Sequence, residues 1–243
     1  MKKAILLLIC PLFLSCFSTR QLSQNRKLLA LQIDSLQQMG AYWETIGPWN
    51  DDDFEQIDSM LMIFPDMLEK VLTNPALDQG SLDTLTFFNA QSRDGRITSF
   101  NWEEKMGGTY QPFYTLLRYV DTKDSVVVDF LDSEIYVDGI YDLQAKNGEI
   151  LYLVIGSGKG CTTCIFSEAN LYRIGREGLE SIFSEYGDYR YTEGSGFDYN
   201  EEKQELDINY YDMECTDISY SFPDSCKVEA HYFFDGENFV IKE

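Results

Sequence analysis

The chain has 243 residues, of which 41 are acidic, 19 are Lys or Arg and one is His, so its formal net charge is −22 at pH 7. Such an acidic surface repels phosphate backbones and anionic membrane surfaces, which argues against nucleic-acid binding. With 16 Tyr, 16 Phe, 3 Trp and only six Pro, the composition excludes a disordered chain. The length suffices for one large domain or two small ones.

The first 18 residues have the layout of a bacterial export signal. A basic start, Met1-Lys2-Lys3, is followed by an apolar run from Ala4 to Leu14 and then by Ser15-Cys16. As a helix, this run spans roughly 16 Å, about half of a bilayer core, so it does not cross a membrane by itself. We therefore predict export. Loss of residues 1–15 leaves 17 basic residues against 41 acidic ones, a net charge of −24.

The segment Phe13-Leu14-Ser15-Cys16 resembles a lipoprotein processing site, although Phe13 replaces the usual aliphatic residue. We predict a signal peptide over residues 1–15, with Cys16 as the lipidated N-terminus. The protein is then expected in the cell envelope, on the periplasmic or cell-surface side, with the lipid as its only membrane attachment. The alternative is a cut after Ser18 (signal peptide 1–18), which yields a periplasmic or secreted protein without lipid.

Residues 16–75 are predicted to form a helical N-terminal segment. The first helix carries an apolar stripe with a seven-residue recurrence, and a second stripe follows the break at residues 47–50. Asp52 and Glu55 can form a capping box, which accounts for the Asp51-Asp52-Asp53 triplet better than a calcium loop does. Pro65 predicts a kink or a split. The stripes comprise Leu22, Leu29, Ile33, Leu36 and Trp43, then Phe54, Ile57, Leu61, Phe64, Leu68 and Val71.

Residues 76–243 are predicted to form an antiparallel β domain, because the hydrophobic period changes to two and turn signals recur at short intervals. No helical stretch separates the expected strands, so they cannot be parallel crossovers. The fold class is therefore mainly β (α+β overall), with a meander forming a barrel, a sandwich or propeller-like blades. The expected strands are 84–89, 96–102, 113–121, 125–130, 139–144, 150–155, 165–174, 179–183, 196–200, 206–211, 227–234 and 239–242.

Several turn and strand motifs in this region resemble those of a group of exported, β-rich Gram-negative proteins. The resemblance covers Thr84 to Lys242 and implies export and a β architecture, with no activity or catalytic residues to transfer. The motifs are Asp94-Gly95-Arg96-Ile97 with Trp102, Gly107-Gly108-Thr109, Tyr141-Asp142-Leu143, 151–156, 171–174 and Phe234-Asp235-Gly236.

Apart from Cys16, four cysteines lie beyond the signal segment: Cys161, Cys164, Cys215 and Cys226. A redox-active Cys-x-x-Cys requires a following helix, whereas a strand is expected here. A zinc site is disfavoured because the second pair lies eleven residues apart. In an exported protein we expect structural disulfides, with the local pairs Cys161–Cys164 and Cys215–Cys226 favoured over a cross-pairing. Closing the longer loop stabilises the fold by about 2–3 kcal/mol.

No sequence motif specifies a reaction. The glycine-rich run 156–160 lacks the Gly-Lys-Ser/Thr ending of a phosphate loop and is expected to be a hairpin connection. His231 is the only histidine, and no G-x-S-x-G motif is present. We therefore expect no catalytic centre, no metal site and no cofactor.

Aromatic side chains are the remaining binding candidates. Tyr186, Tyr189 and Tyr191 lie in a glycine-flanked stretch expected to be a loop, and Trp102 lies near a strand end. Such side chains bind sugar faces or peptide segments. We predict a non-enzymatic binding or scaffold protein of the envelope, with a glycan or an envelope protein as partner.

The alternative is a carboxylate-dependent hydrolase acting on a polymer such as a glycan, which needs two suitably placed acids. The acids that cluster in the expected turns are Asp132, Glu134 and Asp138, and Asp198, Glu201 and Glu202.

Overall fold

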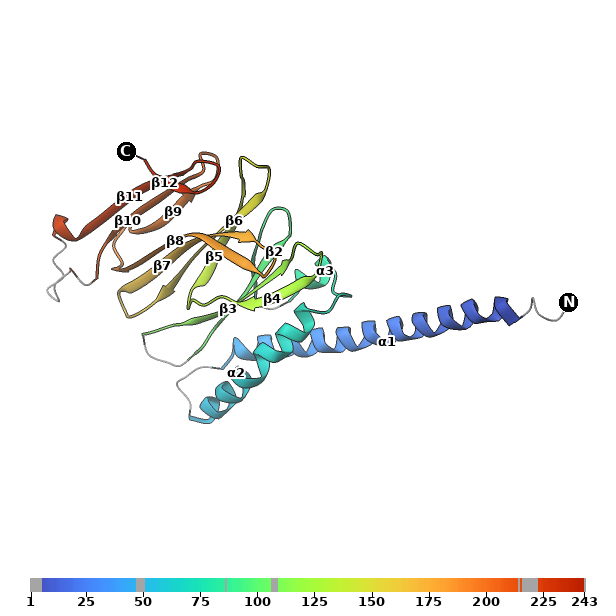
Figure 1. Ribbon diagram of the computed structural model, residues 1–243. Helices are drawn as coiled ribbons and strands as arrows, with labels where there is room; N and C mark the ends of the chain where they lie inside the picture. The colour runs from blue at the N-terminus through green and yellow to red at the C-terminus, as the bar shows by residue number, and fades with distance from the viewer. Residues whose placement is uncertain are drawn as a thin grey trace. The chain divides into compact units, whose positions relative to one another are not determined.

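The computed structural model describes residues 6–46, 51–85, 87–105, 109–213, 215 and 223–242, with side chains described from residue 24 onwards, except those of residues 51–54. The chain divides into two compact units (Figure 1). The first comprises Met1–Thr45 and Asp58–Thr86, and the second comprises Ile46–Ile57 and Phe87–Glu243.

Helix α1, Leu6–Trp43, confirms the stripe predicted for the N-terminal segment. Leu29, Leu36 and Trp43 are buried, whereas the side chain of Leu22 lies outside the described residues. The helix continues through Cys16 without a break. Within the described part of the chain, no helix combines the length and the apolar character needed to cross a membrane.

Helix α2, Asp51–Leu72, buries Phe64, Leu68 and Val71 on one face. Pro65 lies inside this uninterrupted helix, so of the two predicted outcomes, a kink or a split, the split is wrong. Proline removes one backbone hydrogen bond, but the buried residues that flank it stabilise the helix by packing. The predicted capping box at Asp52 lies outside the described side chains.

A short helix, α3, precedes the first strand. It spans Gln79–Leu82, and the Asp78 carboxylate caps it by accepting the Ser81 N–H at 2.8 Å. The Thr84 hydroxyl donates to the Ser81 carbonyl. This turn occupies the start of the strand expected at 84–89, so that strand begins later, at Phe88.

In the described residues, twelve strands make three four-stranded sheets, and in each sheet consecutive strands pair antiparallel (Figure 1). Each sheet is a four-stranded antiparallel meander, which is also the topology of a propeller blade. The described strands form no closed barrel.

The first sheet contains β1 Phe88–Gln91, β2 Ile97–Glu103, β3 Phe113–Val120 and β4 Val126–Phe130. The second contains β5 Tyr136–Gln144, β6 Ile150–Lys159, β7 Cys164–Ile174 and β8 Leu179–Arg190. The third contains β9 Gly196–Asn200, β10 Glu205–Tyr211, β11 Lys227–Phe234 and β12 Phe239–Ile241, with the 3-10 turn η1 at Asp224–Cys226.

The second sheet lies between the other two and is buried on both faces. Its strand β6 shows why: Leu153 packs in a core with the third sheet, and Val154 packs in a core with the first. Successive strand residues point to opposite faces, so an uninterrupted apolar run supplies both cores. The third sheet alternates instead, with Leu206 and Ile208 buried and Asp207 half-buried between them.

Hairpin turns connect neighbouring sheets through hydrogen bonds. The Asp142 carboxylate of β5 accepts the backbone N–H groups of Arg93 and Asp94 at 2.9 and 3.0 Å, in the β1–β2 turn. The Lys146 N–H in the β5–β6 turn donates to the Gly236 carbonyl in the β11–β12 turn at 2.9 Å. Each sheet is thus held to the next at its turns as well as through its core.

Strands β6 and β8 each continue at least four residues beyond their predicted ends. Strand β6 continues through the glycine-rich run to Lys159, because at Gly158 the ring of Phe166 occupies the position of a Cβ. Strand β8 includes most of the stretch predicted as a loop, because the Tyr210 ring packs against Gly187, only 2.7 Å from where a Cβ would lie. These two glycines permit close packing and do not form turns.

Candidate functional site

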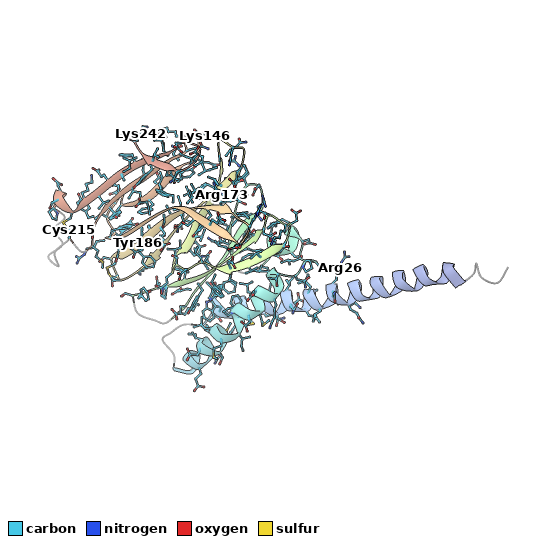
Figure 2. All side chains as sticks on the ribbon, in the orientation of Figure 1. Arg26, Lys146, Arg173, Tyr186, Cys215 and Lys242 are labelled. Atoms are coloured by element: carbon cyan, nitrogen blue, oxygen red, sulfur yellow. A yellow bond between two sulfur atoms is a disulfide. The ribbon has the colours of Figure 1, made fainter. Side chains whose placement is uncertain are left out.

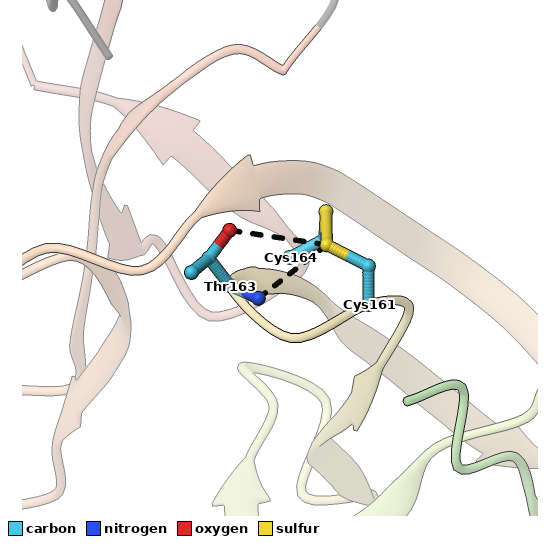
Figure 3. The surroundings of a disulfide bond; sticks show 3 residues. All are labelled: Cys161, Thr163 and Cys164. Atoms are coloured by element: carbon cyan, nitrogen blue, oxygen red, sulfur yellow. Dashed lines mark hydrogen bonds between the residues drawn. A yellow bond between two sulfur atoms is a disulfide. The ribbon is translucent and has the colours of Figure 1, made fainter. Parts of the chain in front are cut away.

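The tip of the β6–β7 hairpin is closed by a disulfide between Cys161 and Cys164 (Figure 3). The Thr163 N–H points at the Cys161 sulfur at 3.4 Å, and the Gly160 N–H donates to the Cys164 carbonyl at 3.0 Å. A strand follows Cys164, as predicted, and no helix dipole acts on the sulfur atoms. The disulfide fixes the shape of a tight turn.

The second disulfide joins Cys215 to Cys226, eleven residues apart. The predicted local pairing is therefore confirmed at both positions. Met213, two residues before Cys215, donates its N–H to the Asp188 carbonyl at 3.0 Å. The chain leading to Cys215 thus runs beside β8, the strand that carries Tyr186 (Figure 2).

A hollow of about 350 Å³, which we call the hairpin pocket, adjoins the first disulfide. Its size falls within the roughly 300–1,000 Å³ range of small-ligand sites. The pocket is lined by Tyr110, Glu134, Gly160, Cys161, Cys164, Phe166, Glu168, Tyr186, Asp188 and Met213.

The strand register brings most of this lining together. Phe166 lies opposite Asp188, and Glu168 lies opposite Tyr186, in the β7–β8 pairing. Cross-strand partners share one face of a sheet, so these four side chains occupy the same patch. The remaining walls come from the segments before β3 and before β5, and from the chain after β10.

Three of the lining residues carry carboxylates, and those of Glu134 and Glu168 accept hydrogen bonds from neighbouring side chains. The Tyr110 hydroxyl donates to Glu134, and the Asn170 amide donates to Glu168 at 3.2 Å. Nowhere in the described residues do three or more His, Cys, Asp or Glu side chains converge as metal ligands. The carboxylates therefore surround the hollow without forming a chelating centre.

The environment of the hairpin pocket raises the pKa of the Tyr186 phenol. Partial burial raises its pKa, and the charges of Asp188, Glu168 and Glu134 raise it further. A negative charge on this oxygen is unfavourable because the three carboxylates already produce a negative potential there. The phenol remains a neutral hydrogen-bonding group with 55% of the residue exposed.

The four aromatic residues predicted to bind a ligand differ in their exposure and in whether they line the hairpin pocket. Tyr186 lines the hairpin pocket, and Tyr191 is exposed outside it. Tyr189 is buried and stacks on Tyr210 with 5.1 Å between ring centroids, while its hydroxyl bonds to the Ser167 hydroxyl at 2.8 Å. Trp102 is also buried, so the surface role predicted for Trp102 and Tyr189 is corrected: their rings belong to the packing of the sheets.

His231 lies on the exposed face of the third sheet, with its Nδ1 2.5 Å from an Asp207 carboxylate oxygen. A hollow of about 460 Å³ on this face also includes Ser195. The Ser195 hydroxyl donates to the Thr192 carbonyl at 2.7 Å, and the Thr192 N–H donates to the Ser195 oxygen. The serine thus bonds within its own turn, and this surface does not assemble a catalytic triad.

The acidic clusters expected in turns are dispersed. Of the first cluster only Glu134 reaches the hairpin pocket, whereas Asp138 accepts the Ser157 hydroxyl at 3.1 Å. In the second cluster Glu201 pairs with Arg93. Cys16 lies within α1, and its side chain is outside the described residues.

Sequence reasoning missed the residues that make the hairpin pocket concave. The sequence places Phe166 and Glu168 in an expected strand and Asp188 in an expected loop, and it does not indicate that Tyr110 lies near them. The available signal was the β7–β8 register, which pairs the residues around Cys164 with the stretch that contains Tyr186. Comparison with protein-family models, curated proteins and solved structures finds no match, so the site rests on its own geometry.

Proposed function

We propose that the protein is an exported, non-enzymatic binding protein, lipid-anchored at Cys16, and that the hairpin pocket holds its ligand. The observation that carries the proposal is a hollow with aromatic and polar walls that is bordered by a disulfide. Aromatic rings provide apolar contact area with a polar edge, as sugar and peptide ligands require. The ligand is proposed to be part of a glycan or of an envelope protein.

Two disulfides support the export part of the proposal, since such bonds persist in oxidising compartments. Intact-mass measurement on membrane fractions tests the anchor. A mature chain that begins at Cys16 and carries the added mass of lipid supports it. A chain that begins at Thr19 contradicts the lipid anchor.

The binding role is tested by thermal melting in the presence of panels of glycans and envelope peptides. A ligand that binds only the folded state raises the melting temperature by mass action. We expect the shift to be lost in Tyr186→Ala and retained in Tyr191→Ala, the matched variant outside the pocket. Absence of any shift, or equal loss in both variants, contradicts ligand binding in the hairpin pocket.

The alternative function is hydrolysis by two carboxyl groups, favoured by the three carboxylates in the pocket lining. Such a reaction needs one protonated and one ionised carboxyl group on either side of the scissile bond. Release of reducing ends from a polysaccharide by the wild-type chain, abolished in both Glu134→Gln and Glu168→Gln, would replace the binding role. Substrate binding without product release would exclude hydrolysis of that polymer.

A further inference from the structure

The charged side chains that line the hairpin pocket are all acidic. Glu134, Glu168 and Asp188 contribute carboxylates, and none of the described residues that line the hollow is Lys, Arg or His. Arg190 lies opposite Cys164 in the strand register, but it is outside the lining. The lining therefore attracts a positive group and supplies no internal counter-charge.

The aromatic part of the lining favours the same kind of group. Tyr110, Phe166 and Tyr186 surround the hollow together with the carboxylates. An ammonium or guanidinium group is attracted by an aromatic ring within about 6 Å, more strongly when it is partly removed from water. Its alkyl stem at the same time finds apolar contacts with the rings and the disulfide.

The size and spacing of the lining argue against a bare metal ion. No described residues converge as metal ligands, and the hollow of about 350 Å³ is far larger than a chelation site. The carboxylates also have hydrogen-bond donors of their own, Tyr110 for Glu134 and Asn170 for Glu168. An organic ligand that fills the hollow fits this arrangement of separate carboxylates better than a metal ion does.

We propose that the hairpin pocket binds an organic cation, an alkylammonium or guanidinium group whose stem packs on the aromatic walls. This inference rests on the proposed binding function and specifies the ligand class. The group is supplied either by a free amine or by a basic side chain of a peptide, and both present the same chemistry to the pocket.

Isothermal titration of the full-length, oxidised protein tests the proposal with three probes. Cadaverine is the free amine, 1,5-pentanediol is its neutral analogue of the same length, and N-acetyl-lysine methylamide presents the side chain in a peptide context. We expect both amines to bind and the diol to bind at least tenfold more weakly. The tighter of the two amines identifies the source.

Matched variants locate the binding. Loss of one carboxylate charge beside a bound cation is expected to weaken the affinity about tenfold, in Glu168→Gln and in Glu134→Gln. Glu202→Gln makes the same change in net charge on the exposed β9–β10 turn and should leave the affinity within about twofold. Circular dichroism of each variant confirms that it is folded.

Three outcomes overturn the proposal. One is equal binding of the diol and the amines, because charge then has no part in recognition. Another is equal weakening in Glu202→Gln and Glu168→Gln, because the attraction then comes from the net charge of the whole chain. The third is the absence of amine binding; if a neutral glycan then binds with dependence on Tyr186, the cation proposal fails and the binding function stands.

Discussion

Replacing Leu153 or Val154 by alanine tests the position of the second sheet between two cores. Leu153 is fully buried in the core shared with β9–β12, and its neighbour Val154 is fully buried in the core shared with β1–β4. Leu153→Ala removes three carbon atoms, worth about 2.4 kcal/mol by transfer and up to about 5 kcal/mol with the cavity included. Val154→Ala removes two, worth about 1.6 kcal/mol before the cavity contribution.

The assay is hydrogen exchange followed by mass spectrometry, combined with urea denaturation. Each variant should accelerate exchange mainly in the sheet that loses contacts, because local opening follows local packing. Leu153→Ala is expected to affect β10 and β11 and to leave β2 and β3 unchanged. Val154→Ala is expected to accelerate exchange in β2 and β3 and to leave β10 and β11 unchanged. The same exchange pattern in both variants would show a single undivided core and refute the assignment of the two faces.

Three further changes probe the turns and the close contacts. Replacing Cys215 and Cys226 by alanine opens an eleven-residue loop and should lower the unfolding free energy by about 2.7 kcal/mol, measured by urea denaturation; an unchanged midpoint would contradict the loop-entropy argument. Gly158→Ala places a Cβ 2.1 Å from the Phe166 ring and should destabilise by about 1–3 kcal/mol, whereas Gly160→Ala meets only contacts of 3.7 Å or more and serves as the control. Burial, and then the charge of Glu168, raise the pKa of Tyr172 to about 12. The contribution of this phenol to stability is therefore complete below about pH 10, where unfolded tyrosine begins to ionise, and is lost as the pH rises to about 12. Urea midpoints between pH 9 and 12 should fall less in Tyr172→Phe, and identical slopes would show that this phenol is not linked to folding.

Strand existence was predictable because alternation is a local property. Strand β11, Lys227–Phe234, has the predicted bounds, and its exposed and half-buried residues alternate as the pattern requires. The turns at Gly148 and Gly236 have positive φ, as their Asn-Gly and Asp-Gly pairs predict. The local disulfide pairing was predictable for the same reason, since each pair closes a short loop.

The strand bounds were predicted wrongly where a glycine provides space for packing and does not form a turn. Gly158 and Gly187 resemble turn signals along the chain, but each provides space for a ring, Phe166 and Tyr210 respectively. The hairpin pocket escaped prediction because its walls come from five separate segments. Such a hollow depends on the stacking of the sheets and on strand register, which no single segment encodes.

The pairing of consecutive strands has a consequence for how the chain acquires its structure. Each sheet is a contiguous stretch, so its backbone contacts have short sequence separation, and short separation favours fast formation. During synthesis from the N-terminus, β1–β4 can pair before β5–β8 is made, and β5–β8 before β9–β12. Folding can thus follow the order of synthesis, with each finished sheet serving as a template for the next.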